Sequence, residues 1–383
     1  MAVGTNGFFK CNSGNRIDAP VVNNIFLMGV LDNIKVIDAS SVLAGPSVAT
    51  FLAELGANVI KVEHPAYGDV TRSWKLPTED KSSSVSAYFS SVNYNKEYIK
   101  LNLSAEEDHV EFMKLIDSAD ILIMNFKRSD YLKFQLDNST LLSRNPRLII
   151  GKINGYGEES DRVAYDLILQ AESGFMSMNG QKDSPPTKMP VAFIDVLAAH
   201  HLKEAILLAL YEREKTNKGK SVSASLYEAA ISSLSNQASN YLMSGNIPQR
   251  IGSLHPNIAP YGELFGTKDG ATMTFAIGSD KHFEKLCRVL KLSHLPASDK
   301  FNSNQMRIAN RQELQKIIEE KTIQLNSGSL LSELEVLNVP AGKVRNLKEV
   351  FEDEKAKALI LEEEIEGIKT KRIRSKIFKS NGN

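Results

Sequence analysis

The sequence has little cysteine and no long hydrophobic run. Its two cysteines, Cys11 and Cys287, lie far apart in the chain, which argues against a disulfide framework and is typical of a reducing compartment. Apolar stretches are short and interrupted by polar residues, so none has the length needed to cross a bilayer. We therefore expect a cytoplasmic protein, or a mitochondrial one if the source is eukaryotic, without a membrane partner.

An excess of charge of either sign is also missing. Lysine and arginine together number 46, as do aspartate and glutamate, so the formal net charge is zero. Proteins that bind nucleic acid normally carry a basic excess, and we expect no such partner here. Residues 1–24 contain neither the basic nor the apolar region of a secretion signal, so we interpret them as a loose N-terminal extension.

The length of 383 residues favours more than one domain, because a single core rarely grows so large. We expect a large α/β domain over residues 25–215, a linker helix region over 216–250 and a small domain over 251–335. Residues 336–383 are expected to return to the large domain. We predict no metal site and no permanently bound cofactor.

Near the N-terminus the sequence predicts a strand, a turn, a helix and a second strand. Residues 34–38 and 58–63 are rich in β-branched residues, and residues 47–55 have apolar positions at helical spacing. This pattern predicts an open, doubly wound parallel sheet, a Rossmann-like fold. A dinucleotide site is disfavoured, because the first turn has a single glycine, Gly45, where that fingerprint needs three.

Two further strands are expected at residues 120–124 and 148–153. Asn125, Lys127 and Arg128 follow the first of them, and the turn Asn154-Gly-Tyr-Gly157 follows the second. Ligands of open parallel sheets bind at the carboxyl ends of the strands. These polar side chains therefore form a candidate binding edge.

One carboxylate, Asp183, stands in a stiff turn between a predicted helix and a short apolar run. Gly180 precedes it by three residues, and Pro185-Pro186 follow it. Glycine permits unusual backbone angles and proline fixes them, so the side chain is held at the tip of a rigid loop. Taken alone, this pattern is more often an ordinary surface turn than a reactive site.

Several stretches together resemble the class III (CaiB/BaiF-like) CoA-transferases, which include formyl-CoA transferase, carnitine CoA-transferase and the succinyl-CoA:dicarboxylate transferases. No single stretch is decisive, but nine of them follow one another in the order found in this family. They cover residues 35–38 with 42–46, then 55–63, 68–72, 125–126, 155–157, 165–168, 180–186, 255–261 and 339–342.

The resemblance implies that Asp183 is the catalytic nucleophile. Its carboxylate would attack an acyl-CoA thioester to give a mixed anhydride, then an aspartyl-CoA thioester from which an acceptor acid takes the CoA. The same resemblance implies an interlocked homodimer, with the large domain built from both chain ends and a smaller α+β domain between them. It places CoA, a substrate rather than a resident cofactor, against Leu43, Ala44, His64, Arg72, Asn125, Phe126, Lys127, Lys133, Asn154 and Tyr156.

The sequence also departs from the family's pattern. Relatives usually continue Asn-Phe with Arg-Pro-Gly, where this chain has Lys127-Arg128-Ser129. Lys127 and Lys133 keep the charge of an arginine but lose its two-pronged hydrogen bonding. The glycine-rich loop of formyl-CoA transferases is absent, and residues 255–260 stand in its place. This difference favours a dicarboxylic acid or a similar small organic acid as the acceptor.

Two other functions compete with this interpretation. An α-methylacyl-CoA racemase of the same superfamily would need a histidine where this chain has Tyr165, although an aspartate is present at the second position, Asp195. A phenol is a poor base near neutral pH, so we interpret Asp195 as a helix N-cap before Val196. The other rival is a catalytically silent CoA-binding protein, against which only the intact Asp183 loop argues.

Overall fold

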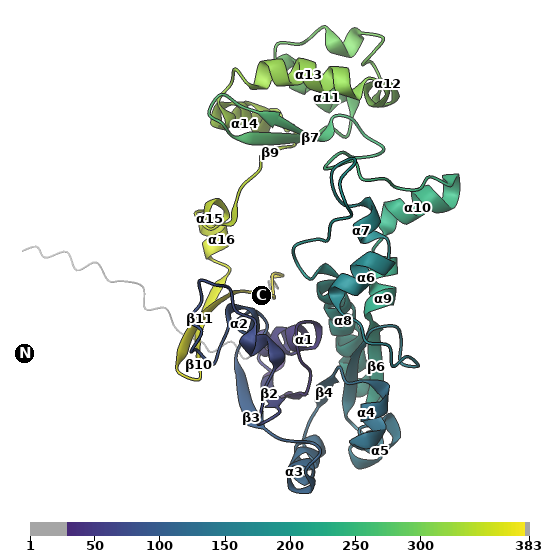
Figure 1. Cartoon of the computed structure of the whole chain (residues 1–383), viewed down its shortest axis with the longest axis vertical. Helices are drawn as coiled ribbons and strands as arrows, with labels where there is room; N and C mark the ends of the chain where they lie inside the picture. The colour runs from purple at the N-terminus through teal and green to yellow at the C-terminus, as the bar shows by residue number, and fades with distance from the viewer. Residues whose placement is uncertain (1–28, 380–383) are drawn as a thin grey trace, which may run out of the picture.

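A computed structural model describes residues 29–379, which form a large unit and a small unit (Figure 1). The large unit contains a six-stranded parallel sheet in the order β3-β2-β1-β4-β5-β6, so the expected doubly wound α/β architecture is confirmed. The predicted extension at 1–24 and Cys11 lie outside the described residues. The strands are β1 Lys35–Asp38, β2 Asn58–Glu63, β3 Lys96–Lys100, β4 Ile121–Met124, β5 Ile149–Asn154 and β6 Lys220–Ser225.

Helices cover both faces of this sheet because its central strands are apolar on both sides. Val36 and Ile121 pack into one core with the helices α1 and α8, while Ile37 and Leu122 pack into a second core with α3. Alternate side chains of one strand thus enter opposite cores. The covering helices are α1 Ala44–Glu54, α3 Glu106–Asp117, α4 Arg128–Lys133, α5 Asn138–Arg144, α8 Phe193–Thr216 and α9 Leu226–Ser232.

The small unit has a separate sheet and a separate core. Its three antiparallel strands lie in the order β7-β8-β9, and β7 and β8 form a hairpin. Cys287 is buried in this core, and burial raises the pKa of its thiol to about 12. The elements are β7 Tyr261–Gly266, β8 Thr272–Ala276, β9 Ala341–Lys343, α11 Asp280–Val289, α12 Asn304–Ala309, α13 Arg311–Thr322 and α14 Ser327–Val336.

Some elements differ from the sequence-based expectation. The helix predicted before the Asp183 turn is broken at Gly174, whose φ is +90°, into α6 Asp166–Glu172 and α7 Phe175–Met178. Within the linker helix region expected over 216–250, the sequence also predicts a strand at residues 221–226. This strand is β6, which pairs with β5 at the edge of the large sheet and is followed by α9 and α10 Ser235–Ser244. No helix within residues 29–379 has the length and apolar character needed to cross a membrane.

The chain returns to the large unit after β9, as the resemblance implied. Helices α15 Leu347–Val350 and α16 Glu354–Lys357 lead to a hairpin, β10 Ile360–Ile365 and β11 Ile368–Ile373, which packs against α2 Ala87–Ser91 (Figure 1).

The side chain of Glu54, at the end of α1, holds this return in place. Its carboxylate pairs with Arg372 and accepts hydrogen bonds from the backbone NH groups of Ser375 and Lys376, at 3.0 and 2.6 Å. Burial alone would raise the pKa of Glu54, but these contacts outweigh it and lower the pKa. Glu54 and Arg372 are both buried, so each depends on the other for its charge to be tolerated.

We expect Glu54→Ala to destabilise the protein by about 3–5 kcal/mol, because it leaves the Arg372 charge buried without a partner. Chemical denaturation followed by circular dichroism would measure the loss, and limited proteolysis should cut the C-terminal return more readily. Glu111→Ala is the control, since Glu111 forms an exposed pair with Lys114 worth less than about 1 kcal/mol. Equal effects of the two substitutions would contradict the anchoring role of Glu54.

Candidate active site

The site begins at the carboxyl edge of the large sheet, where Asn125 joins two strand ends. Its side-chain amide donates to the Ser41 carbonyl at 2.9 Å, and its side-chain oxygen accepts from the Ser41 NH at 3.0 Å. The next residue, Val42, has a φ of +72°, which a β-branched residue rarely adopts. The Val42 NH points to Asp69 at 3.2 Å. The loop after β1 is therefore held in a strained shape at the point where the strand order reverses.

A cluster of buried charged side chains stabilises this edge of the sheet. Lys96 donates to Asp38 at 2.8 Å, and Lys61 forms ion pairs with Asp38 and Asp69 at 3.7 and 3.3 Å. Burial by itself would raise the pKa of Asp38, but the two lysines lower it to about 2. Burial lowers the pKa of Lys96 to about 8 despite its partner. The four groups satisfy one another, so we assign them a structural role.

Two cavities open on either side of Phe126 and Ser41, which line both. The first, which we call the β2 cavity, has a volume of about 570 Å³. His64 and Tyr67 stack there with ring centroids 3.8 Å apart, which gives one wall a flat aromatic surface. Of the predicted CoA contacts, the structure places His64, Phe126 and Lys133 in this cavity.

The second cavity, which we call the β5 cavity, has a volume of about 320 Å³ and lies at the ends of β4 and β5. Of the predicted CoA contacts, Asn125, Phe126, Lys127 and Asn154 line it. Sequence reasoning missed Lys152, which also lines it, because a lysine in an apolar strand was interpreted as part of the strand.

Four predicted contacts do not line either cavity. Leu43 and Ala44 lie at the start of α1, and Ser41 and Val42 line the β5 cavity instead. The Tyr156 hydroxyl donates to Glu172 at 2.7 Å. These positions place the three residues beside the cavities rather than in them.

Arg72 is the fourth of these residues, and its guanidinium is already paired with side chains of the protein. Its guanidinium makes a bidentate contact with Glu63, at 2.8 and 2.6 Å, and lies 3.9 Å from the ring centroid of Phe89. It also pairs with Glu366 of the C-terminal hairpin at 3.3 Å. This arrangement favours a structural role, in which Arg72 joins the loop after β2 to the chain's C-terminal return.

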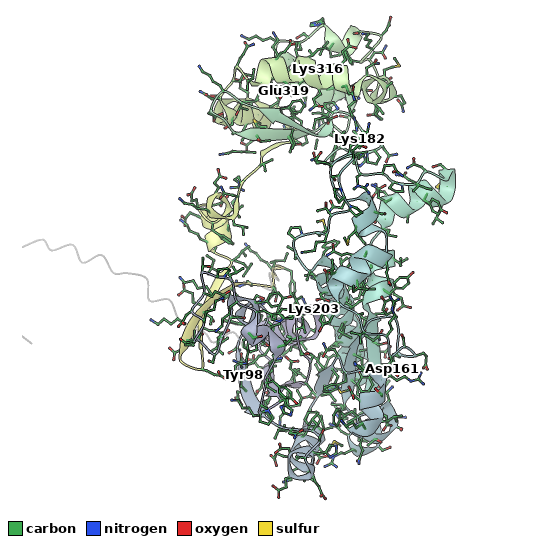
Figure 2. The ribbon with its side chains drawn as sticks, in the orientation of Figure 1. Tyr98, Asp161, Lys182, Lys203, Lys316 and Glu319 are labelled. Atoms are coloured by element: carbon green, nitrogen blue, oxygen red, sulfur yellow. The ribbon has the colours of Figure 1, made fainter. Side chains whose placement is uncertain are left out.

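Asp183 lies at the tip of a loop that hydrogen bonds hold at its base. The loop is closed by a bond from the Gly252 NH to the Gly180 carbonyl at 2.9 Å, and Arg250 donates to the Ser184 carbonyl at 2.8 Å. The φ of Asp183 is +64°, an uncommon value for a residue with a side chain. The side chain itself is exposed. Figure 2 shows the neighbouring Lys182 near the small unit, far from Asp161, which lines the β5 cavity.

A second carboxylate, Asp195, lies in a more enclosed setting. It is the third residue of α8 and is 8% exposed. Our expectation that it caps this helix is wrong, because Asp166 of α6 does so by accepting from the Ile194 NH at 2.7 Å. Burial raises the pKa of Asp195 to about 7, and the charge of Asp166 adds to the shift. Tyr88 faces the same two carboxylates, and burial with their charge raises its pKa to about 12.

Asp195 lines neither cavity, but it is linked to the β5 cavity through Asp166. Tyr165 lines the β5 cavity, and the next residue is Asp166, whose carboxylate holds the backbone NH beside Asp195. The positive end of the α8 macrodipole favours negative charge in its first turn. A buried carboxyl group with a raised pKa, close to a cleft, is a candidate reactive group. Within residues 29–379 no group of histidine, cysteine and carboxylate side chains is suited to hold a metal ion.

Comparison with known proteins extends over nearly the whole chain. The model of CoA-transferase family III matches residues 31–378. A succinate–glutarate CoA-transferase of Agrobacterium fabrum is 36% identical over 342 residues, which are 88% of this chain and 85% of that protein. A succinyl-CoA:mesaconate CoA-transferase of Haloarcula marismortui is 36% identical over 334 residues, covering 85% and 83%. The crystal structure of a CaiB/BaiF family protein from Brucella suis matches with a TM-score of 0.80 at 36% identity, covering 93% and 94%.

The environment of Asp195 predicts a pH-dependent stability. A carboxyl group whose pKa is higher in the folded state stabilises the fold below its unfolded pKa, and this stability is lost as the pH rises through the folded value. A rise from 3.8 to about 7 corresponds to a loss on the order of 4 kcal/mol between about pH 4 and pH 7. Asp195→Asn should therefore melt above the wild type at pH 8, with the difference vanishing near pH 4. The exposed Asp183→Asn is the control, and a difference for Asp195→Asn that does not depend on pH would contradict the assignment.

Proposed function

The chain belongs to CoA-transferase family III, and we propose that it transfers CoA from the thioester of one dicarboxylic acid to another free dicarboxylic acid. The observation that carries the proposal is the similarity, over more than four-fifths of the chain, to transferases whose names pair succinate with glutarate or mesaconate. The absence of a glycine-rich loop at residues 255–260 favours the same acceptor class. Measuring CoA exchange between succinyl-CoA and a panel of mono- and dicarboxylic acids tests it.

The proposed chemistry needs a carboxylate that attacks the thioester carbonyl. The bond between this carboxylate and the acyl group forms as the carbon–sulfur bond breaks, which gives a mixed anhydride and a CoA thiolate. The thiolate then attacks the aspartyl carbonyl, giving an aspartyl-CoA thioester and the free donor acid. The acceptor acid reverses these steps. The site must exclude water, because an anhydride hydrolyses readily.

Two aspartates are candidates for this role. The family resemblance points to Asp183. Asp183 is exposed at a loop tip in the single chain, and the second subunit of the homodimer proposed below would shield an anhydride there from water. Asp195 is buried and lines neither the β2 nor the β5 cavity, and its raised pKa favours the uncharged acid over the attacking carboxylate. We therefore propose Asp183 as the reacting carboxylate, with Asp195 as the alternative.

A pair of asparagine variants separates the two assignments. We expect Asp183→Asn to lower kcat by more than about 10³-fold, because the amide cannot form the anhydride, while Asp195→Asn keeps most of the activity. Acyl-CoA without acceptor, followed by hydroxylamine and peptide mass spectrometry, should mark Asp183 in the wild type. Modification of Asp195 together with an active Asp183→Asn variant would reverse the assignment.

The same incubation tests the competing functions. A racemase would introduce deuterium from heavy water into the α-position of the acyl group and leave both aspartates unmodified. A silent CoA-binding protein would bind acyl-CoA but show neither exchange nor an adduct. Either result in the wild type would refute the transferase proposal.

We also propose that the protein is a homodimer. The support is an apolar surface that the single chain leaves open. Helix α10 has no buried residue, yet it carries Leu242 and Met243, which are 78% and 88% exposed. Leu208 and Tyr211 are likewise exposed on α8. An apolar groove of about 520 Å³ lies between α7 and α10. Exposed apolar surface of this kind marks an interface with another protein.

Light scattering should give the mass of a dimer at micromolar concentration. The double variant Leu242→Asp/Met243→Asp should dissociate it or weaken it strongly, because two charges would be buried in the apolar contact. Leu132→Asp is the matched control, since Leu132 is 73% exposed on α4, away from this surface. A wild-type monomer, or equal behaviour of both variants, would contradict the proposal.

A further inference from the structure

A buried lysine at the end of β5 has no hydrogen-bond partner within residues 29–379. Lys152 is 6% exposed and lines the β5 cavity. The carboxylate within ion-pair range, that of Glu158, lies 3.7 Å from the ammonium, which is too far for a hydrogen bond. The ammonium also lies 4.9 Å from the centre of the Tyr131 ring. A largely buried ammonium group without a hydrogen-bond acceptor in the described chain is suited to bind an anion that enters the cavity.

A second polar group lines the same cavity without a partner. Tyr131, on α4, has a buried hydroxyl that forms no hydrogen bond within the described part of the chain. Burial raises the pKa of this hydroxyl beyond its usual range, so it remains a proton donor. Lys152 and Tyr131 come from different elements, and both offer donors to one enclosed space. Such unsatisfied donors are typical of a site whose ligand is an acceptor.

The other charged groups around the cavity are largely paired with each other. Arg128 binds Glu159 at 2.7 Å, and Arg162 is paired with Glu172 outside the cavity. Asp161, labelled in Figure 2, accepts from the Ser129 NH at 3.1 Å. The remaining lining charges are the cations Lys127 and Lys152 and the anion Glu158, which is 41% exposed at its side chain. The cavity is therefore suited to an anion that reaches Lys152 from the side opposite Glu158.

We propose that Lys152 and Tyr131 bind a phosphate group of the CoA thioester. The inference rests on the proposed function, in which CoA is the substrate that carries phosphate. A phosphate offers several acceptor oxygens to one ammonium and one hydroxyl. The adjoining β2 cavity, with the stacked His64 and Tyr67, provides a flat surface suited to the adenine ring. Because the two cavities share Ser41 and Phe126, one CoA molecule can reach both.

A carboxylate of the acceptor acid fits the site less well. Neither Asp183 nor Asp195 lines the β5 cavity, so the reacting atoms lie elsewhere. A small acid held at Lys152 would be separated from both candidate nucleophiles. The phosphate end of CoA, by contrast, is remote from the thioester, so it is expected to bind at a distance from both aspartates.

Binding measurements on Lys152→Met test the proposal. Methionine keeps the length of the side chain and removes its charge, and replacing a buried ion by an apolar residue of similar size is well tolerated. We expect the affinity for CoA, measured by titration calorimetry, to fall about tenfold or more. The affinity for the corresponding pantetheine, which has no phosphate, should stay unchanged. Tyr131→Phe should show the same pattern with a smaller loss.

The controls separate this inference from the proposed function. Lys218→Met, at an exposed lysine before β6, should bind CoA like the wild type. Inorganic pyrophosphate should compete with CoA for binding to the wild type but should not compete with CoA for binding to Lys152→Met. Equal losses of affinity for CoA and pantetheine, or unchanged CoA binding, would overturn the role of Lys152 but leave the proposed function standing. A wild type that binds no acyl-CoA and transfers none would overturn the proposed function itself.

Discussion

The structure depends on a buried carboxylate, Asp38, at the end of β1. Together with Asp69 it balances the charges of Lys61 on β2 and Lys96 on β3, the next two strands on one side of β1 in the sheet. In the low-dielectric interior these four charges are tolerable only together. Their pairing therefore fixes the relative position of β1, β2 and β3 where the first loop leaves the sheet. Lys61 also donates to the Ser40 carbonyl at 2.8 Å, so the cluster reaches the loop that borders both cavities.

Asp166 has a comparable role on the other side of the site. One carboxylate oxygen accepts from the Ile194 NH and the other from the side chain of Gln170. Gln170 in turn accepts from the Met189 NH at 2.7 Å. The Asp166 side chain thus connects the two ends of the segment between α6 and α8, which includes the Asp183 loop. It also places its own charge beside Asp195, where burial and this charge together raise the pKa of the carboxyl group.

The sequence predicted what depends on local pattern and missed what depends on distant contacts. The bounds expected for β2 are those observed, because alternating β-branched residues and flanking turns mark a strand. Asn125 and Asn154 were found because strand ends of a parallel sheet share one edge. Asp195 was misinterpreted because its helix is capped from 28 residues away, by Asp166. Lys152 carries no local signal, since its significance lies in a cavity shared with α4.

The two chain ends of the large unit impose an order on folding. Glu54 can form its contacts only after Arg372 and Ser375 have been synthesised, and these residues follow it by 318 and 321 residues. The small unit has its strands and its hydrophobic core between residues 261 and 343, so it can form before the C-terminal return is synthesised. The large sheet can also assemble early, but the flank of α1 stays uncovered until the last residues are synthesised. Contacts of such long sequence separation form slowly, so the newly made chain spends an interval in which this flank is open to chaperones or to another copy.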